Sequence, residues 1–114
     1  MSYFESYQQT VFFYPPTLFI PGVTQPYDVY TTNYLSTRNY TLIATVQNID
    51  TNVVVRLEGS LDGENYGAMI SNTIIENGTY AYNVGGFPVK FIRGNFFKRV
   101  GGNNANVTFQ MAAN

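Results

Sequence analysis

The chain has 114 residues and a mass of 12.8 kDa, the size of one domain, and only 11 % of its residues are charged. It contains neither His nor Cys, which excludes zinc fingers, haem ligation, disulfide frameworks and the Ser-His-Asp and Cys-His catalytic constellations. Six Lys and Arg against seven Asp and Glu give a net charge of −1, which offers no basic footprint for nucleic acid or an anionic membrane.

Residues 1–37 are rich in proline and aromatic side chains. They hold four of the five prolines, six of the ten tyrosines and four of the nine phenylalanines, but only two charged residues, Glu5 and Asp28. Proline fixes φ and removes a hydrogen-bond donor, so this part cannot be a helix. The pattern predicts two extended pieces, about residues 9–14 and 17–20, broken at Pro15-Pro16. Disordered tails are poor in aromatics and rich in charge, and this segment is the reverse.

A sandwich built from residues 40–111 does not need eleven aromatic residues from residues 1–40 for its own core. These side chains must cover a flank of their own sandwich or a neighbouring subunit, and we favour the neighbouring subunit. We therefore predict that residues 1–37 form an extended assembly arm and that residues 38–114 form the globular domain. The predicted subunit-interface residues are Phe4, Tyr7, Phe12, Phe13, Tyr14, Pro15, Pro16, Phe19, Tyr27, Tyr30 and Tyr34.

From residue 40 onward the hydrophobic period is two, which is typical of strands with one buried face. Strands are predicted over residues 40–47 and 53–60, with Arg56 and Glu58 outward on the second. The inward residues are predicted to be Tyr40, Leu42, Ala44, Val46, Val53, Val55 and Leu57.

Further along the chain, turn residues separate short apolar runs. Two short runs are predicted over residues 68–70 and 73–75. Asn77-Gly78 predicts a type I′ hairpin turn, because both of its central residues need positive φ. After a strand over residues 80–84, two more are predicted over 89–93 and 95–99, with a bulge at Gly94, and a last one over 107–111. Seven or eight short strands without a helical period predict an all-β fold, an antiparallel β-sandwich of immunoglobulin-like or jelly-roll type.

Two clusters could carry chemistry. Asp62-Gly63-Glu64-Asn65 could be a calcium loop or a glycosidase pair, but it lacks the ligand spacing of the first, and carboxylates on one turn seldom converge as the second requires. We interpret it as a plain turn. Four basic residues alternate with three phenylalanines, which could suit a nucleic-acid groove. We instead expect strand alternation, with Phe91 inward and Lys90 outward, and a basic patch that meets an acidic neighbour. The members of this second cluster are Lys90, Phe91, Arg93, Phe96, Phe97, Lys98 and Arg99.

The order of turn and strand motifs over residues 40–111 resembles small β-sandwich modules in virion proteins of tailed bacteriophages, the decoration or accessory proteins of the head or tail. Related-looking modules occur in bacterial surface and spore proteins, some of which polymerise into fibres. The resemblance implies no catalytic residues. Tyr66 stands where such modules commonly carry Trp, which argues against an aromatic binding role at that loop. The segments that carry the resemblance are residues 53–66, 77–80, 87–93 and 101–108.

These observations predict a non-enzymatic structural protein of a virus particle, a phage capsid or tail decoration subunit that assembles through its N-terminal arm. Its expected partners are copies of itself or a major capsid or tail protein, with no nucleic acid, membrane, cofactor or metal ion. The alternatives are a self-polymerising bacterial surface filament subunit and a carbohydrate-binding module that uses Tyr66.

The start of the chain lacks the basic region and apolar run of a signal peptide, and no stretch of about 18 apolar residues occurs. We therefore expect a soluble protein that is made in the host cytoplasm and assembled into the virion. In the alternative functions it would reach a cell or spore surface.

Overall fold

The computed structural model describes residues 9–11, 13–29, 39–85 and 89–113. In this part of the chain no helix is long and apolar enough to cross a membrane. The strands are β1 (Gln9–Val11), β2 (Thr17–Leu18), β3 (Gly22–Val23), β4 (Tyr27–Asp28), β5 (Asn39–Gln47), β6 (Asn52–Ser60), β7 (Gly67–Ile74), β8 (Gly78–Gly85), β9 (Phe91–Val100) and β10 (Asn106–Ala113).

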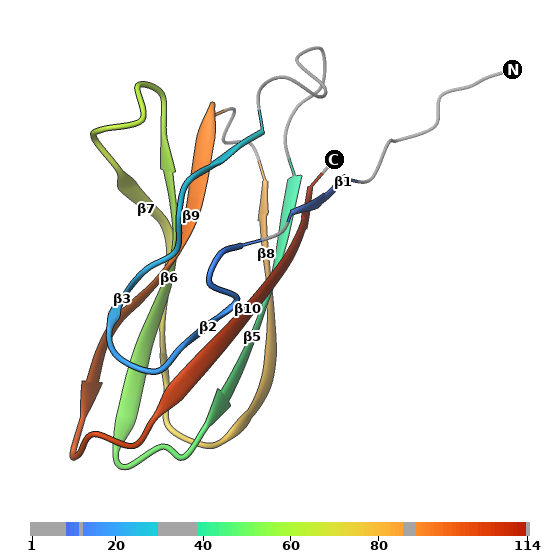
Figure 1. Cartoon of the computed structure of the whole chain (residues 1–114). Helices are drawn as coiled ribbons and strands as arrows, with labels where there is room; N and C mark the ends of the chain where they lie inside the picture. Colours follow the sequence, from blue (N-terminus) through green and yellow to red (C-terminus); the bar gives the residue numbers. More distant parts are fainter. Residues whose placement is uncertain (1–8, 12, 30–38, 86–88, 114) are drawn as a thin grey trace, which may run out of the picture.

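The strands form two antiparallel sheets that pack face to face, which confirms the predicted all-β sandwich (Figure 1). The first sheet runs in the order β1-β10-β5-β8, with β2 also paired to β10. The second runs β3-β9-β6-β7, with β4 also paired to β9. If β1/β2 and β3/β4 are each counted as one interrupted strand, the eight positions have the orders 1-8-3-6 and 2-7-4-5. This is the jelly-roll connectivity, one of the two predicted alternatives.

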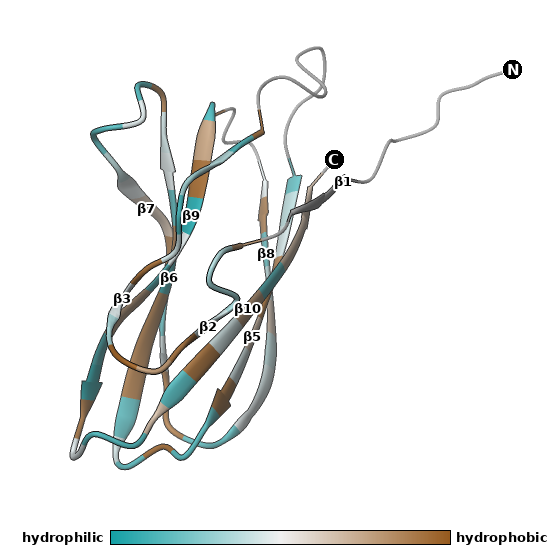
Figure 2. Ribbon diagram, viewed as in Figure 1, coloured by the Kyte–Doolittle hydropathy of each residue, from teal (hydrophilic) through white to brown (hydrophobic). Residues whose placement is uncertain are grey.

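The core lies between the sheets and follows the predicted alternation of side chains. Every second residue of β5, from Tyr40 to Val46, is fully buried, and the same holds for the inward residues of β6, from Val53 to Leu57. Figure 2 shows brown, hydrophobic bands along strands of both sheets. Gly94 on β9 lets the two sheets approach, because a Cβ atom there would lie 2.8 Å from Cδ2 of Phe109 on β10.

Residues 9–11 and 13–29, which we call the N-terminal strap, run along one side of the sandwich and cover an edge of each sheet. The Phe109 amide donates to the Pro16 carbonyl (2.9 Å), and the Thr24 amide donates to the Gly94 carbonyl (2.9 Å). The strap is broken into short pieces at its prolines, which have no amide to donate. The extended pieces predicted over residues 9–14 and 17–20 appear as shorter strands, β1 and β2, on either side of Pro15-Pro16.

The predicted boundary at residue 38 does not separate these residues from the globular domain. Residues 9–29 supply the first two of the eight strand positions. The reason is that β9 and β10 would otherwise present unpaired edges, and an extended Pro-rich segment can cover them in short steps. Residues 1–8 and 30–38, the rest of the predicted arm, lie outside the described residues.

The predicted hairpin at Asn77-Gly78 is wrong. β7 and β8 lie in different sheets, so this segment carries the chain from one sheet to the other. A type I′ turn needs positive φ at both central residues, but among the described non-glycine residues only Asn48 has one (58°). The Asn77 side chain instead accepts a hydrogen bond from the Ile49 amide (2.9 Å), which ties the crossing to the β5–β6 turn.

Two further local predictions are corrected. The runs over residues 68–70 and 73–75 belong to one strand, β7. The bulge in β9 falls at Phe97, because Val54 pairs with Lys98 while Val55 pairs with Phe96. Gly94 does not mark a bulge. It leaves room for the Phe109 ring, which lies close to its backbone.

Candidate functional site

The structure describes six of the eleven predicted interface residues. Five lie outside the described residues: Phe4, Tyr7, Phe12, Tyr30 and Tyr34. Of the six, Tyr27 and Pro15 are half-buried, and Tyr14 and Pro16 are exposed. Tyr27 packs against the core of its own subunit. An interface role for the exposed members stays a prediction.

The assignment of Phe13 to a subunit interface is corrected. Its side chain is only 5 % exposed and belongs to the core of its own subunit. The ring meets Phe109 edge to face, with centroids 6.2 Å apart and planes at 76°. Aromatic pairs favour this arrangement. β1 and β2 pair with β10 of their own subunit, so Phe13 between them packs on the same subunit's core.

Large apolar side chains are exposed on the link between β2 and β3 and at the end of β3. Phe19 is 69 % exposed and Ile20 66 %, and Val23 is exposed as well. We call Phe19, Ile20 and Val23 the strap patch. The link is held in place, because Nη1 of Arg99 donates to the Phe19 carbonyl (2.8 Å) and Val23 pairs with Asn95. The strap patch therefore consists of exposed apolar side chains on a backbone that is bonded to β9.

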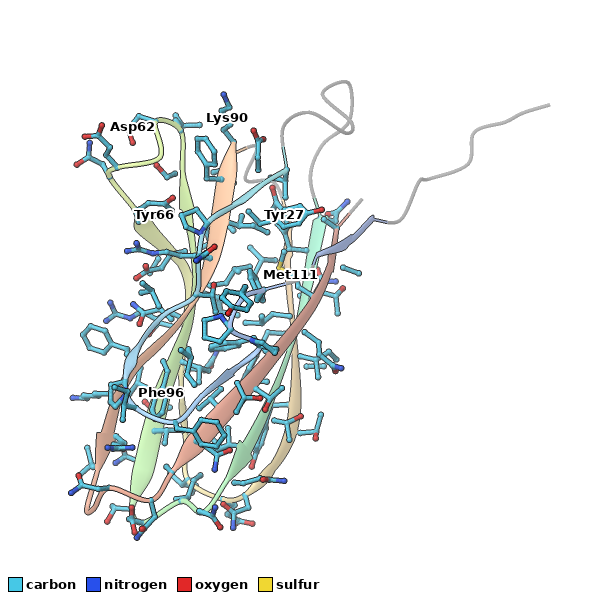
Figure 3. The ribbon with its side chains drawn as sticks, viewed as in Figure 1. Tyr27, Asp62, Tyr66, Lys90, Phe96 and Met111 are labelled. Atoms are coloured by element: carbon cyan, nitrogen blue, oxygen red, sulfur yellow. The ribbon has the colours of Figure 1, made fainter. Side chains whose placement is uncertain are left out.

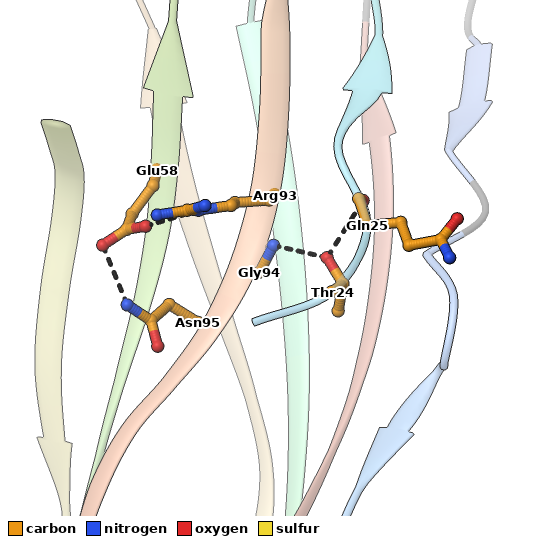
Figure 4. Close-up of polar contacts among 6 residues, drawn as sticks. All are labelled: Thr24, Gln25, Glu58, Arg93, Gly94 and Asn95. Atoms are coloured by element: carbon orange, nitrogen blue, oxygen red, sulfur yellow. Dashed lines mark hydrogen bonds and ion pairs between the residues drawn. The ribbon is translucent and has the colours of Figure 1, made fainter. Parts of the chain in front are cut away.

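A second feature lies on the outer face of the second sheet, where Glu58 points away from the core but is buried. Nε of Arg93 donates to Oε1 of Glu58 (2.8 Å), and Nδ2 of Asn95 donates to Oε2 (2.9 Å), as Figure 4 shows. The Glu58 side chain is 8 % exposed and the Arg93 side chain 25 %. The outward direction predicted for Glu58 is correct, but its exposure is not what alternation suggests, since neighbours on β9 cover it.

Tyr66, the residue of the carbohydrate-binding alternative, packs beside this ion pair (Figure 3 labels it). The Arg93 guanidinium lies 3.8 Å from the centroid of the Tyr66 ring, a cation–π contact that covers one ring face. The Tyr66 hydroxyl is buried without a hydrogen-bond partner, and burial raises its pKa. A ring held in this way is less suited to stacking on a sugar than a free one.

The basic cluster of β9 does not form one patch of free cations. Arg93 pairs with Glu58, and Arg99 donates to the Phe19 and Ala105 carbonyls. Phe96 is fully buried in the core. The direction predicted for Phe91 is wrong: Ile92 and Phe96 face the core, so Phe91 and Arg93 lie on the outer face.

The Asp62 loop is a hydrogen-bonded turn, which confirms that interpretation. Oδ1 of Asp62 accepts hydrogen bonds from the Glu64 and Asn65 amides (both 2.8 Å) and from the Ser60 hydroxyl (3.0 Å), and Oδ2 accepts one from Nδ2 of Asn65 (2.7 Å). These bonds, led by the two backbone amides, hold the Asp62 pKa well below its usual range. Across the described part of the chain, no group of three or more acidic residues could hold a metal ion.

One polar feature escaped the sequence analysis. Asn48, Ile49, Asp50 and Asn104 line a shallow depression of about 380 Å³ where two loops meet at one end of the sandwich. The Asp50 carboxylate accepts hydrogen bonds from the Asn104 side chain (2.9 Å) and amide (3.1 Å), which lower its pKa. These loops are 54 residues apart, so no local pattern could have joined them. The hydrogen bonds between Asn104 and Asp50 join the two loops at this end of the sandwich.

No family model matches this chain, and no curated protein matches it significantly. Among solved structures, the chain is similar to the SPBc2 prophage-derived protein YomS, with a TM-score of 0.61 and 8 % sequence identity. The similarity covers 98 % of each chain. It extends over the whole jelly roll, including the N-terminal strap, and at this identity it shows a shared fold.

Proposed function

We propose that this protein is a non-enzymatic structural component of a bacteriophage particle, an accessory subunit of the head or tail. The observation that carries the proposal is the end-to-end structural similarity to a prophage-derived protein. A jelly roll alone would not suffice, because lectins and cupins use this architecture as well as viral capsid proteins.

The strap patch supports an assembly role. A buried aromatic side chain covers about 150–250 Å². Phe19 is 69 % exposed, so it has roughly 100–170 Å² left to bury, and about 25 cal/mol per Å² gives about 3–4 kcal/mol before ordering costs. Because the strap patch carries no charge, a contact through it would depend little on salt. In this proposal the patch docks on a major capsid or tail protein, and the protein is localised to the virion.

The test is whether the protein is a part of particles. Particles from a host that carries the gene would be banded in a density gradient and labelled with antibody and gold against this chain. The expected result is regular labelling at the head or at the tail. A Phe19→Ala variant should no longer bind to the particles, so that their labelling is lost. A Leu61→Ala variant, changed at an equally exposed apolar residue of the Asp62 loop, should remain bound and labelled. Unlabelled particles from lysates that contain the protein would overturn the proposal, and so would long fibres formed by the pure protein.

A further inference from the structure

The two sides of the sandwich differ in how their sheet edges are covered. On one side the N-terminal strap pairs with β9 and β10. On the other side β8 ends the first sheet and β7 ends the second, and within the described residues no strand pairs with their outer edges. Such edges offer rows of backbone amides and carbonyls that fit one kind of partner, another extended strand.

The side with the open edges also lacks two of the usual protections against pairing, charged residues and proline within the strands. Between Asn65 and Val89 the sequence holds one charged residue, Glu76, which lies in the crossing between β7 and β8. Neither strand contains proline. Soluble proteins commonly protect edge strands with lysine, proline or a bulge, because an unprotected edge pairs with another chain. An uncharged edge can meet an identical edge without repulsion.

Of the two edges, β8 is the better template. β7 carries a bulge, because Leu57 pairs with Ile70 while Glu58 pairs with Ala68, and a bulge disturbs the strand's edge. β8 pairs with β5 over eight consecutive residues without a shift in register. At about 3.3 Å per residue, its free edge is roughly 26 Å long.

The side chains of β8 suit a second strand at its edge. Thr79, Ala81 and Asn83 are exposed, small and uncharged. Tyr80 and Tyr82 are half-buried and pack against the core, so a neighbouring strand would cover what remains of their rings. Burial already raises the Tyr82 pKa.

We propose that β8 is a self-association edge, at which two copies of this chain pair β8 to β8 in antiparallel orientation about a twofold axis. Antiparallel pairing of one strand with itself is isologous, so a single uncharged strand supplies both halves of the contact. The two first sheets then form one continuous sheet across the dimer. This inference rests on the proposed function and deepens it, because it names a second copy of the chain as a partner. The strap patch stays free to contact the particle.

The test is a charge-swap experiment read out by sedimentation equilibrium on the full chain. The wild type should be dimeric. Ala81→Lys and Ala81→Glu, each alone, should place like charges near one another and raise the dimer dissociation constant about two- to fivefold. An equimolar mixture of the two variants should restore the dimer. Thr73→Lys, at an exposed position of β7, is the matched control and should remain dimeric.

Several outcomes would overturn the proposal. A wild type that stays monomeric, a Thr73→Lys variant that dissociates equally, or a mixture that does not recover would each refute β8 pairing. A double Phe4→Ala/Tyr7→Ala variant that turns monomeric would show that a neighbour's N-terminal residues occupy the edge. If an Ala81 variant fails to fold by circular dichroism, Asn83→Lys and Asn83→Glu replace the pair. Dimers in solution with unlabelled particles would refute the virion role alone, and labelled particles with monomers in solution would refute β8 pairing alone.

Discussion

Phe13 and Phe19 lie six residues apart in one Pro-rich segment, and the structure gives them opposite roles. Phe13 is 5 % exposed and packs on Phe109, whereas Phe19 is 69 % exposed. Replacing a buried phenylalanine by alanine removes its burial and leaves a cavity, which costs about 3–5 kcal/mol. Substitutions at exposed sites stay within about 0.5 kcal/mol. Phe13→Ala should therefore destabilise the subunit strongly, and Phe19→Ala should leave the free energy of unfolding nearly unchanged.

The assay is thermal and urea unfolding followed by far-ultraviolet circular dichroism, since the chain has no Trp. For a domain of this size, about 4 °C per kcal/mol converts the expected loss for Phe13→Ala into a fall in Tm of roughly 12–20 °C. Both variants are measured at a concentration at which the oligomeric state of the wild type is known. Equal stability of the Phe13 variant and the wild type would refute the placement of the N-terminal strap in its own subunit.

Three further predictions concern stability. Gly94→Ala should lower the free energy of unfolding in urea by about 1–3 kcal/mol, because the new Cβ would press on the Phe109 ring. Gly67→Ala, with no atom within 4 Å of its Cβ, is the control and should leave stability unchanged. Equal effects of the two substitutions would contradict the close packing at Gly94. Glu58→Ala should cost about 2–3 kcal/mol, because it leaves Arg93 and Asn95 without their acceptor, and a loss below about 0.5 kcal/mol would count against a buried pair. Asp62, whose pKa is lowered in the folded state, stabilises the fold above its ordinary pKa of 3.8, and this contribution disappears as pH falls through the lower folded-state value. The difference in the free energy of unfolding between wild type and Asp62→Asn, measured as a function of pH, should therefore narrow below about pH 4. A difference that stays constant with pH would show that the ionised Asp62 carboxylate does not stabilise the fold.

The sequence was sufficient for the fold class and for the core of the two central strands. The period of two from Tyr40 to Val46 reports burial of one sheet face, and that is a local signal. The Asp62 turn was also predictable, because its hydrogen bonds join residues within five positions of one another. What failed depended on contacts between distant segments.

Asn77-Gly78 illustrates the limit. Its local preference for a hairpin turn was overridden because β5 and β6, each already in a different sheet, take β8 and β7 as their separate partners. Phe13 illustrates it again, because aromatic excess in a Pro-rich segment has the same appearance whether the segment packs on itself or on a neighbour. The segment packs on its own subunit because the edges of β9 and β10 pair with it. These strands lie about 70 to 100 residues further along the chain. The buried Glu58 pair likewise joins residues 35 and 37 positions apart.

The most direct test of a structural role in a phage particle is the copy number of this chain in purified particles, by quantitative mass spectrometry before and after a high-salt wash. The expected result is a fixed number of copies per particle, in constant ratio to the major capsid or tail protein, that the wash does not reduce because the proposed contact is apolar. A trace amount that varies between preparations, or is removed by salt, would contradict the proposed role.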